Sequence, residues 1–144
     1  MPPLATYSNG VPAPPILDQP PALDSARASG PAMRTFLAIM RDWKITTATR
    51  ITLLGTTRTT YYQWRRNPER ARLSRDQVER LSYIFGIYKA LQILFPAPEN
   101  ADGWVKRENT DPPFGGRRPI DLMREGLVAD LYRVRRYLDG ARGW

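Results

Sequence analysis

The sequence predicts an all-α protein with a helix-turn-helix-like N-terminal half and a helical C-terminal half. Apolar residues recur at three- and four-residue spacing along successive segments, which is typical of helices that bury one face. No segment shows the alternating pattern of a strand, and prolines and glycines separate the periodic segments. We therefore expect a proline-rich arm over residues 1–30, a helix-turn-helix-like region over 31–95 and a second helical region over 96–144.

The composition excludes several kinds of chemistry. The 144 residues include no cysteine and no histidine, which rules out disulfides, thiol nucleophiles, zinc fingers and histidine acid–base catalysis. We therefore expect no enzyme, no metal site and no cofactor. The chain has no run of about 18 apolar residues and begins without the basic and apolar regions of a signal peptide. We expect a cytoplasmic protein that does not contact a membrane.

The first 31 residues hold 8 of the 14 prolines and carry a net charge of −1. Proline blocks helices and sheet ladders, so this segment is predicted to be a disordered or polyproline-like arm. A first helix is expected over residues 31–43, because Pro31 suits the first turn of a helix. The apolar residues that follow form one helical stripe: Phe36, Leu37, Met40 and Trp43.

Residues 45–66 have the outline of a helix-turn-helix, in which the second helix enters the DNA major groove. Thr46 or Thr47 can cap the first helix, and Gly55 suits the turn. The recognition helix is predicted over residues 57–66, with Tyr61 and Trp64 facing inward. Arginine suits guanine edges, glutamine suits adenine, and threonine can contact bases or phosphates. The candidate DNA-binding residues are Thr57, Arg58, Thr59, Tyr62, Gln63, Arg65 and Arg66.

The charge distribution supports this assignment. Residues 32–75 contain ten Lys and Arg against two Asp and Glu, whereas residues 76–144 have a net charge of only +1. The formal charge of +8 is therefore confined to one segment, as expected for a nucleic-acid interface. Two positions depart from the usual motif: Ile51, where a small residue is usual, and Thr56, where an apolar one is. The alternative is a helical hairpin that keeps the fold and binds no DNA.

The longest helix is predicted over residues 75–95. It opens with a capping box, Ser74 to Gln77, and carries apolar residues on a face wide enough to be buried on two sides. Such a helix is either a dimer interface or the centre of the core. We expect a homodimer or a larger assembly on the first interpretation.

The C-terminal region is predicted to contain a turn of helix around Trp104, a glycine-rich loop, a short helix from Pro119 and a last helix over residues 127–139. Gly115-Gly116 lacks the lysine spacing and the preceding strand of a phosphate-binding loop, so we expect it to let the loop pass close to another backbone. Gly126 should stop the short helix, and Gly140 the last one. The apolar stripe of the last helix is Leu127, Leu131, Val134 and Leu138.

This C-terminal region resembles the toxin-binding domain of the Xre/MbcA/ParS family of antitoxins. The resemblance rests on the order Trp104, Asn109, the stretch FGGRRPIDLM at 114–123, Gly126 and Tyr137-Leu138, and the N-terminal half fits the layout of the family. The residues of the structural motif are Trp104, Phe114, Gly115, Gly116, Pro119 and Gly126.

The resemblance, which covers residues 31–144, implies a type II antitoxin. Its partner would be a toxin of the RES-domain type, which attacks NAD or uses it to ADP-ribosylate a target. The antitoxin would neutralise that toxin largely through its C-terminal helices and repress its own operon by binding operator DNA through its N-terminal half. A stand-alone helix-turn-helix regulator is the alternative.

The end of the chain supplies a candidate inhibitory element. Arginine makes forked contacts with carboxylates, and tryptophan fills flat slots. We therefore expect the last helix and tail to lie across the substrate cleft of the toxin and exclude NAD. The alternative is a solvated helix face with a frayed end. The candidate toxin-binding residues are Arg133, Arg135, Arg136, Tyr137, Arg142 and Trp144.

Overall fold

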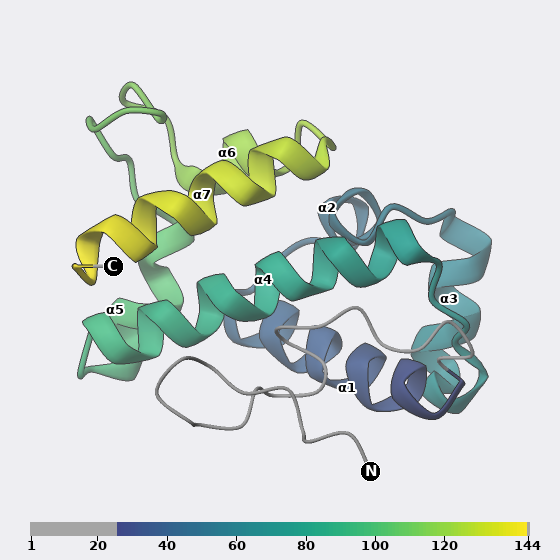
Figure 1. Cartoon of the computed structure of the whole chain (residues 1–144). Helices are drawn as coiled ribbons and strands as arrows, with labels where there is room; N and C mark the ends of the chain where they lie inside the picture. Colours follow the sequence, from purple (N-terminus) through teal and green to yellow (C-terminus); the bar gives the residue numbers. More distant parts are fainter. Residues whose placement is uncertain (1–25, 144) are drawn as a thin grey trace, which may run out of the picture.

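A computed structural model describes residues 26–143, and over that range the chain is helical with no strand. The predicted all-α class is therefore confirmed. Most of the predicted arm, and Trp144, lie outside the described residues. Along residues 26–143, no helix is both long enough and apolar enough to cross a membrane. The elements, shown in Figure 1, are α1 (Ala26–Asp42), α2 (Thr47–Leu54), α3 (Arg58–Arg66), the 3₁₀ turn η1 (Pro68–Arg70), α4 (Arg75–Leu94), α5 (Pro98–Gly103), the 3₁₀ turn η2 (Trp104–Lys106), α6 (Pro119–Met123) and α7 (Val128–Ala141).

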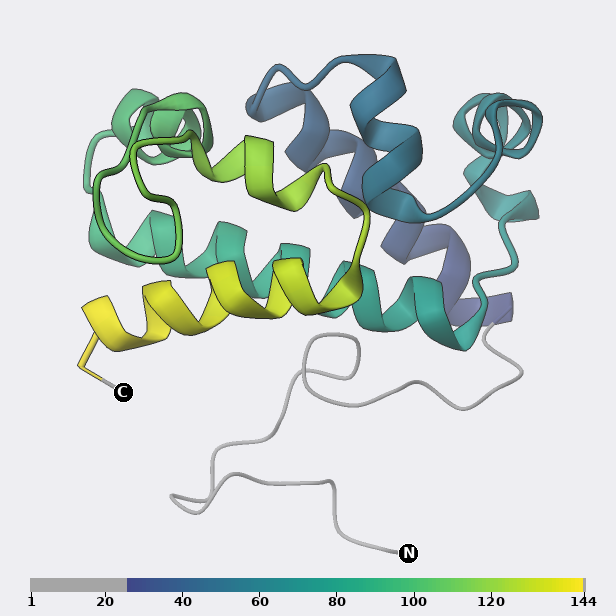
Figure 2. The same ribbon diagram turned by 90° about the horizontal axis from the view of Figure 1, so that it is seen from above.

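Helix α4 is the centre of the molecule. The predicted capping box opens it: the Ser74 Oγ accepts from the Gln77 N–H at 3.1 Å, and the Gln77 Oε1 accepts from the Ser74 N–H at 2.9 Å. Helix α7 lies alongside α4 and runs in the same direction, while α1 and α2 pack against other parts of it (Figures 1 and 2). The side chains that fill these contacts are buried: Val78, Leu81, Ile84, Phe85, Ile87 and Leu91.

Elements of the same chain therefore cover the wide apolar face of α4. Of the two interpretations of this helix, a dimer interface or the centre of the core, the structure shows the second. The premise of the dimer prediction was wrong, because α7 folds back over the surface that a second copy was expected to cover. Other contacts tie the end of α1 to α4 and to the C-terminal half. The Tyr88 hydroxyl donates to Asp42 Oδ2 at 3.0 Å, and the Lys106 ammonium donates to the carbonyl of Lys44.

Helix α1 begins at Ala26, so the predicted start at residue 31 was wrong. Pro31 lies inside the helix rather than in its first turn. Ser29 explains the earlier start, because its buried hydroxyl accepts a hydrogen bond of 3.1 Å from the Leu73 N–H, just before α4. That contact fixes a turn of helix that local sequence signals did not indicate.

The predicted turn of the helix-turn-helix is confirmed. Thr46 caps α2, and Gly55 ends it in the left-handed region with φ 71°. The turn is docked on α4, because Gln77 Nε2 donates to the Gly55 carbonyl at 3.2 Å and the Arg80 side chain lies against Gly55. Ile51 is half-buried against the core, and α2 and α3 still contact each other, so the larger side chain is accommodated.

Two details of the last helix differ from the prediction. Leu127 precedes α7 as its N-cap residue and is 63% exposed, so it does not belong to the buried stripe of Leu131, Val134 and Leu138. Gly140 does not end α7, which continues to Ala141. A left-handed glycine follows shortly after the helix, at Gly143, with φ 82°.

Candidate nucleic-acid and partner interfaces

Helix α3 presents the predicted DNA-binding residues to solvent. Thr57 is its N-cap, and the Thr57 Oγ1 accepts from the Thr60 N–H at 3.2 Å. Tyr61 is fully buried and Trp64 is half-buried, as predicted, which fixes the inward face. All seven candidates from Thr57 to Arg66 are exposed. Arg65 also lies over the Tyr62 ring, with its Cζ 5.9 Å from the ring centroid.

The basic side chains of residues 32–75 fall into two groups: some bond to other parts of the protein and hold the fold, and others form no ion pair within the described part of the chain. Arg50 donates from Nε to the Ile45 carbonyl at 2.9 Å and from Nη1 to the Tyr61 hydroxyl at 3.3 Å, so it ties α2 to α3. Arg34 pairs with Glu69, and Arg72 donates to two backbone carbonyls. Four arginines on α3 and η1 form no ion pair with any described residue: Arg58, Arg65, Arg66 and Arg70.

The C-terminal half is organised by an aromatic cluster. The Trp104 and Tyr137 rings stack with centroids 6.0 Å apart, and the buried Phe114 ring meets both edge-on, at 5.8 Å and 5.1 Å. The loop that carries Phe114 closes through the Asn109 N–H, which donates to the Arg117 carbonyl at 3.0 Å. Together with Pro119, which is buried at the start of α6, these aromatic residues form the interior of this half.

The glycine pair in that loop has a different role from the predicted one. The Gly116 N–H donates to the Asn109 carbonyl at 2.8 Å, but a Cβ added at Gly115 or Gly116 would meet nothing within 4 Å, so the close approach of a backbone does not require glycine here. The two residues have φ 60° and 93°, and this left-handed conformation explains the requirement for glycine. Gly126 has φ 95° but does not end α6, which stops earlier, at Met123, with Arg124 as its C-cap.

The candidate toxin-binding residues do not form one surface. Tyr137 belongs to the aromatic cluster, and its hydroxyl donates to Asp111 Oδ2 at 2.7 Å and accepts from Asn109 Nδ2 at 3.3 Å. The Asn109 hydrogen bond lowers the pKa of Tyr137, but burial and Asp111 together outweigh it and raise that pKa. Arg135 is half-buried against Gly86 of α4 and bonds Asp139 at 3.4 Å. Arg142 is half-buried as well.

Only Arg133 and Arg136 of these candidates are exposed on α7. Tyr132, which the sequence analysis missed, shares their face at helical spacing, is 44% exposed and packs edge-on against Tyr83 at 5.7 Å. Tyr132 can be identified from the sequence, because it lies outside the buried stripe of Leu131, Val134 and Leu138. Arg133 pairs with the buried Asp130 at 3.6 Å. Other basic side chains of this half are paired as well: Arg117 with Glu125 at 2.8 Å, and Arg118 with Asp121 at 2.8 Å, where the Arg118 hydrogen bond lowers the pKa of Asp121.

The two surfaces lie at different places along α4: α3 is beside its first turns, whereas Tyr132 of the exposed α7 face packs against Tyr83 in its middle. Figure 1 shows α3 beside the first turns of α4, and α5 and the end of α7 beside its last turns. A helix of 20 residues spans about 30 Å. The geometry defines a helix-turn-helix protein with a separate helical surface on α7.

Comparison with known proteins assigns this helix-turn-helix protein to a family. Residues 22–86 match the antitoxin Xre-like helix-turn-helix domain, and residues 90–143 match the antitoxin Xre/MbcA/ParS C-terminal toxin-binding domain. The chain is also 41% identical over 130 residues to the uncharacterized protein y4oB of Sinorhizobium fredii (strain NBRC 101917 / NGR234), covering 90% of this chain and 97% of that protein.

The chain belongs to the Xre/MbcA/ParS family of antitoxins. It therefore combines a helix-turn-helix domain, which indicates DNA as a ligand, with a domain that binds a toxin. This is the composition of a regulator. The two matched segments meet inside α4, at residues 86 and 90, so both halves share that helix.

Proposed function

We propose that this antitoxin neutralises a RES-domain toxin that uses NAD and represses its own operon by binding operator DNA. The observation that carries the proposal is the pair of adjoining domain matches, one for DNA and one for a toxin. The assignment of the toxin to the RES class rests on the resemblance of residues 31–144 to antitoxins of that partner. The stand-alone regulator is less favoured, because it leaves residues 90–143 without a role.

The DNA-binding part of the proposal is supported by α3. Its free arginines and exposed Gln63 occupy the surface that a recognition helix turns toward the major groove. The N-terminal residues of such a helix contact base edges, which here places Arg58 and Thr59 against the bases. A gel-shift series on the promoter of the gene, at increasing salt, tests this part. Salt-sensitive binding is expected, and the absence of binding with or without toxin would contradict it.

The toxin-binding part is supported by the exposed face of α7, which presents Tyr132, Arg133 and Arg136. Tyrosine and arginine are enriched among the anchors of protein interfaces. We propose that this face contacts the toxin and that the end of the chain, from Arg142 to Trp144, covers the NAD cleft. Arg135 and Tyr137 would then hold α7 in place rather than contact the toxin.

Truncation after Arg142 tests the cleft hypothesis without shortening α7. The Arg142 N–H still donates to the Leu138 carbonyl at 3.0 Å, so the helix end is kept. NAD consumption by the toxin at a fixed antitoxin ratio should rise with the truncated protein, while binding to DNA stays unchanged. Full inhibition by the truncated protein would show that residues 143–144 do not act as a plug.

We also propose that the protein works as a homodimer or within a larger toxin–antitoxin assembly. A two-fold dimer would place two α3 helices about 34–36 Å apart, one turn of DNA. The apolar face of α4 no longer supports this, but the aliphatic side chains of Ile93 and Leu127 are exposed among residues 26–143. Light scattering of the free and toxin-bound protein measures the stoichiometry, and a monomer in both would contradict the proposal.

A further inference from the structure

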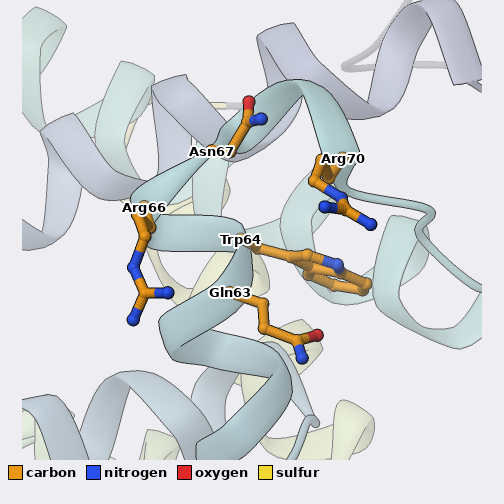
Figure 3. Close-up of a pocket in the computed structure, with 5 residues that line it drawn as sticks. All are labelled: Gln63, Trp64, Arg66, Asn67 and Arg70. Atoms are coloured by element: carbon orange, nitrogen blue, oxygen red, sulfur yellow. The ribbon is translucent and has the colours of Figure 1, made fainter.

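A pocket lies at the C-terminal end of α3, where the chain turns into η1. It has a volume of about 580 Å³ and is lined by Gln63, Trp64, Arg66, Asn67 and Arg70. Figure 3 shows that Gln63, Trp64 and Arg70 extend toward one side, with Arg66 extending the other way. The half-buried Trp64 gives the pocket a fixed wall, because its ring is held partly in the core.

The lining of this pocket is made of hydrogen-bond donors. Two guanidinium groups, two side-chain amides and an indole N–H supply them, and no lining residue is a carboxylate. The carboxylate that follows in the chain, Glu69, is paired with Arg34 and so does not neutralise the pocket. Arg66 and Arg70 form no ion pair with any residue between 26 and 143. Such a site fits an anion with several acceptor oxygens.

The position of the pocket indicates which molecule supplies that anion. Arg58 and Arg70 lie at opposite ends of the unit formed by α3 and η1, and α3 alone spans about 13 Å. When the first turn of α3 faces base edges, the pocket lies where the sugar–phosphate backbone borders the groove. Arginine is suited to phosphate because its forked donors bind two oxygens together.

We infer that the pocket binds a backbone phosphate of DNA and fixes how deeply α3 enters the groove. This inference rests on the proposed function and extends it, by separating α3 into a base-reading start and a phosphate-binding end. Arg70 supplies the main charge, and Gln63 donates from its amide on the side to which both extend, whereas Arg66 adds a second charge from the opposite wall of the pocket. The contact carries no sequence information, because every nucleotide offers the same phosphate.

The test measures the salt dependence of DNA binding for Arg70→Gln and Arg66→Gln. Two duplexes of equal length are used, one from the promoter of the gene and one unrelated. The slope of log K against log salt should fall by about 0.9 for each phosphate that the variant no longer neutralises, equally on both duplexes. Arg70→Lys keeps the charge and should keep the slope while weakening binding. Lys89→Gln, which removes an exposed cation from α4 at a distance from α3, is the charge-matched control and should leave the slope unchanged.

The outcomes separate this inference from the proposed function. If the unaltered protein binds neither duplex, the proposed function fails and the phosphate site fails with it. If that protein binds DNA with a normal salt dependence and neither glutamine variant changes the slope, only the phosphate site is wrong. Inorganic pyrophosphate is titrated in parallel by calorimetry. Tight, saturable binding that Arg70→Gln abolishes would identify a free anion as the ligand and overturn the assignment to DNA.

Discussion

Gly86 of α4 lies directly beneath the guanidinium of Arg135 of α7, and a Cβ at position 86 would overlap that group. The missing side chain lets the two parallel helices pack closely while Arg135 stays bonded to Asp139. An arginine that the sequence places on an open helix face is therefore part of the contact between the two halves of the protein.

This contact predicts a coupling between the two positions. Alanine is favoured over glycine in a helix by about 1 kcal/mol. Gly86→Ala should therefore stabilise the protein by this amount only when Arg135 is also replaced by alanine. In the parent protein the new methyl group displaces the guanidinium of Arg135, which offsets the gain in stability. A double-mutant cycle by urea unfolding should give a coupling of about 0.5 kcal/mol or more. Equal effects of Gly86→Ala in both backgrounds would show that Arg135 moves away freely.

Gly55→Ala should destabilise the protein by about 1–3 kcal/mol, since alanine is strained at φ 71° and its methyl group would meet Arg80. Because the turn sets the angle of α3, DNA binding should weaken as well. Gly140→Ala is the matched control: Gly140 is helical and has open space around it, so a gain of about 0.5–1 kcal/mol is expected. Thermal unfolding of both variants gives the comparison, and a loss at position 140 would contradict it.

Tyr88 should make stability depend on pH in the alkaline range. Burial, and next the hydrogen bond to Asp42, raise the pKa of Tyr88 from 10.0 to about 12. The folded protein therefore holds this proton more tightly than the unfolded chain does. The contribution is fully present below about pH 10 and is lost as pH rises through about 12. Unfolding free energies measured across this range should fall less for Tyr88→Phe than for the parent protein. Parallel curves would show that Tyr88 does not contribute.

Arg58→Ala should relax sequence preference at one operator position by about 1–3 kcal/mol if Arg58 reads a guanine. The first turn of α3 is where base contacts are expected, and Arg58 is exposed there without an ion pair to another described residue. Competition between the operator and single-base variants measures the preference. Uniform weakening on all sequences would instead assign Arg58 to a phosphate.

Tyr132→Ala and Arg136→Ala should each weaken toxin neutralisation, by about 2 kcal/mol or more for a central anchor. Arg136 is exposed on the proposed toxin-binding face, so its removal should leave folding nearly unaffected, whereas Tyr132→Ala also loses the edge-on contact with Tyr83, worth about 0.5–1.5 kcal/mol. Lys89→Ala removes a comparable exposed side chain from α4 and should neutralise the toxin normally. Inhibition titrations of all three proteins decide the point, and unchanged titrations for both α7 variants would place the interface elsewhere.

The parts of the fold that sequence signals predicted are those that local chemistry determines. The cap of α4 by Ser74 and Gln77 and the left-handed turn at Gly55 each depend on residues within a few positions. The exposed residues of α3 followed from the same reasoning, because Tyr61 and Trp64 fix its inward face.

The errors share a different cause, which is contact between distant residues. Ser29 extends α1 by bonding Leu73, 44 positions away, and Arg135 is drawn inward by Gly86 on another helix. Tyr137 is held by Asp111 across the aromatic cluster. The pocket below α3 also escaped prediction, since it exists only because η1 turns back beside the helix. None of these partners can be identified from spacing along the chain.

Because both halves share α4, the protein unfolds as a single cooperative unit, and this affects how it is degraded in the cell. Because its buried residues support both halves, local opening of α4 exposes the interior of each at once. A ligand at either end stabilises the whole chain by mass action, so a bound toxin also protects the helix-turn-helix from proteases. One cleavage within α4 would conversely disrupt both halves together, and with them both of the proposed binding surfaces.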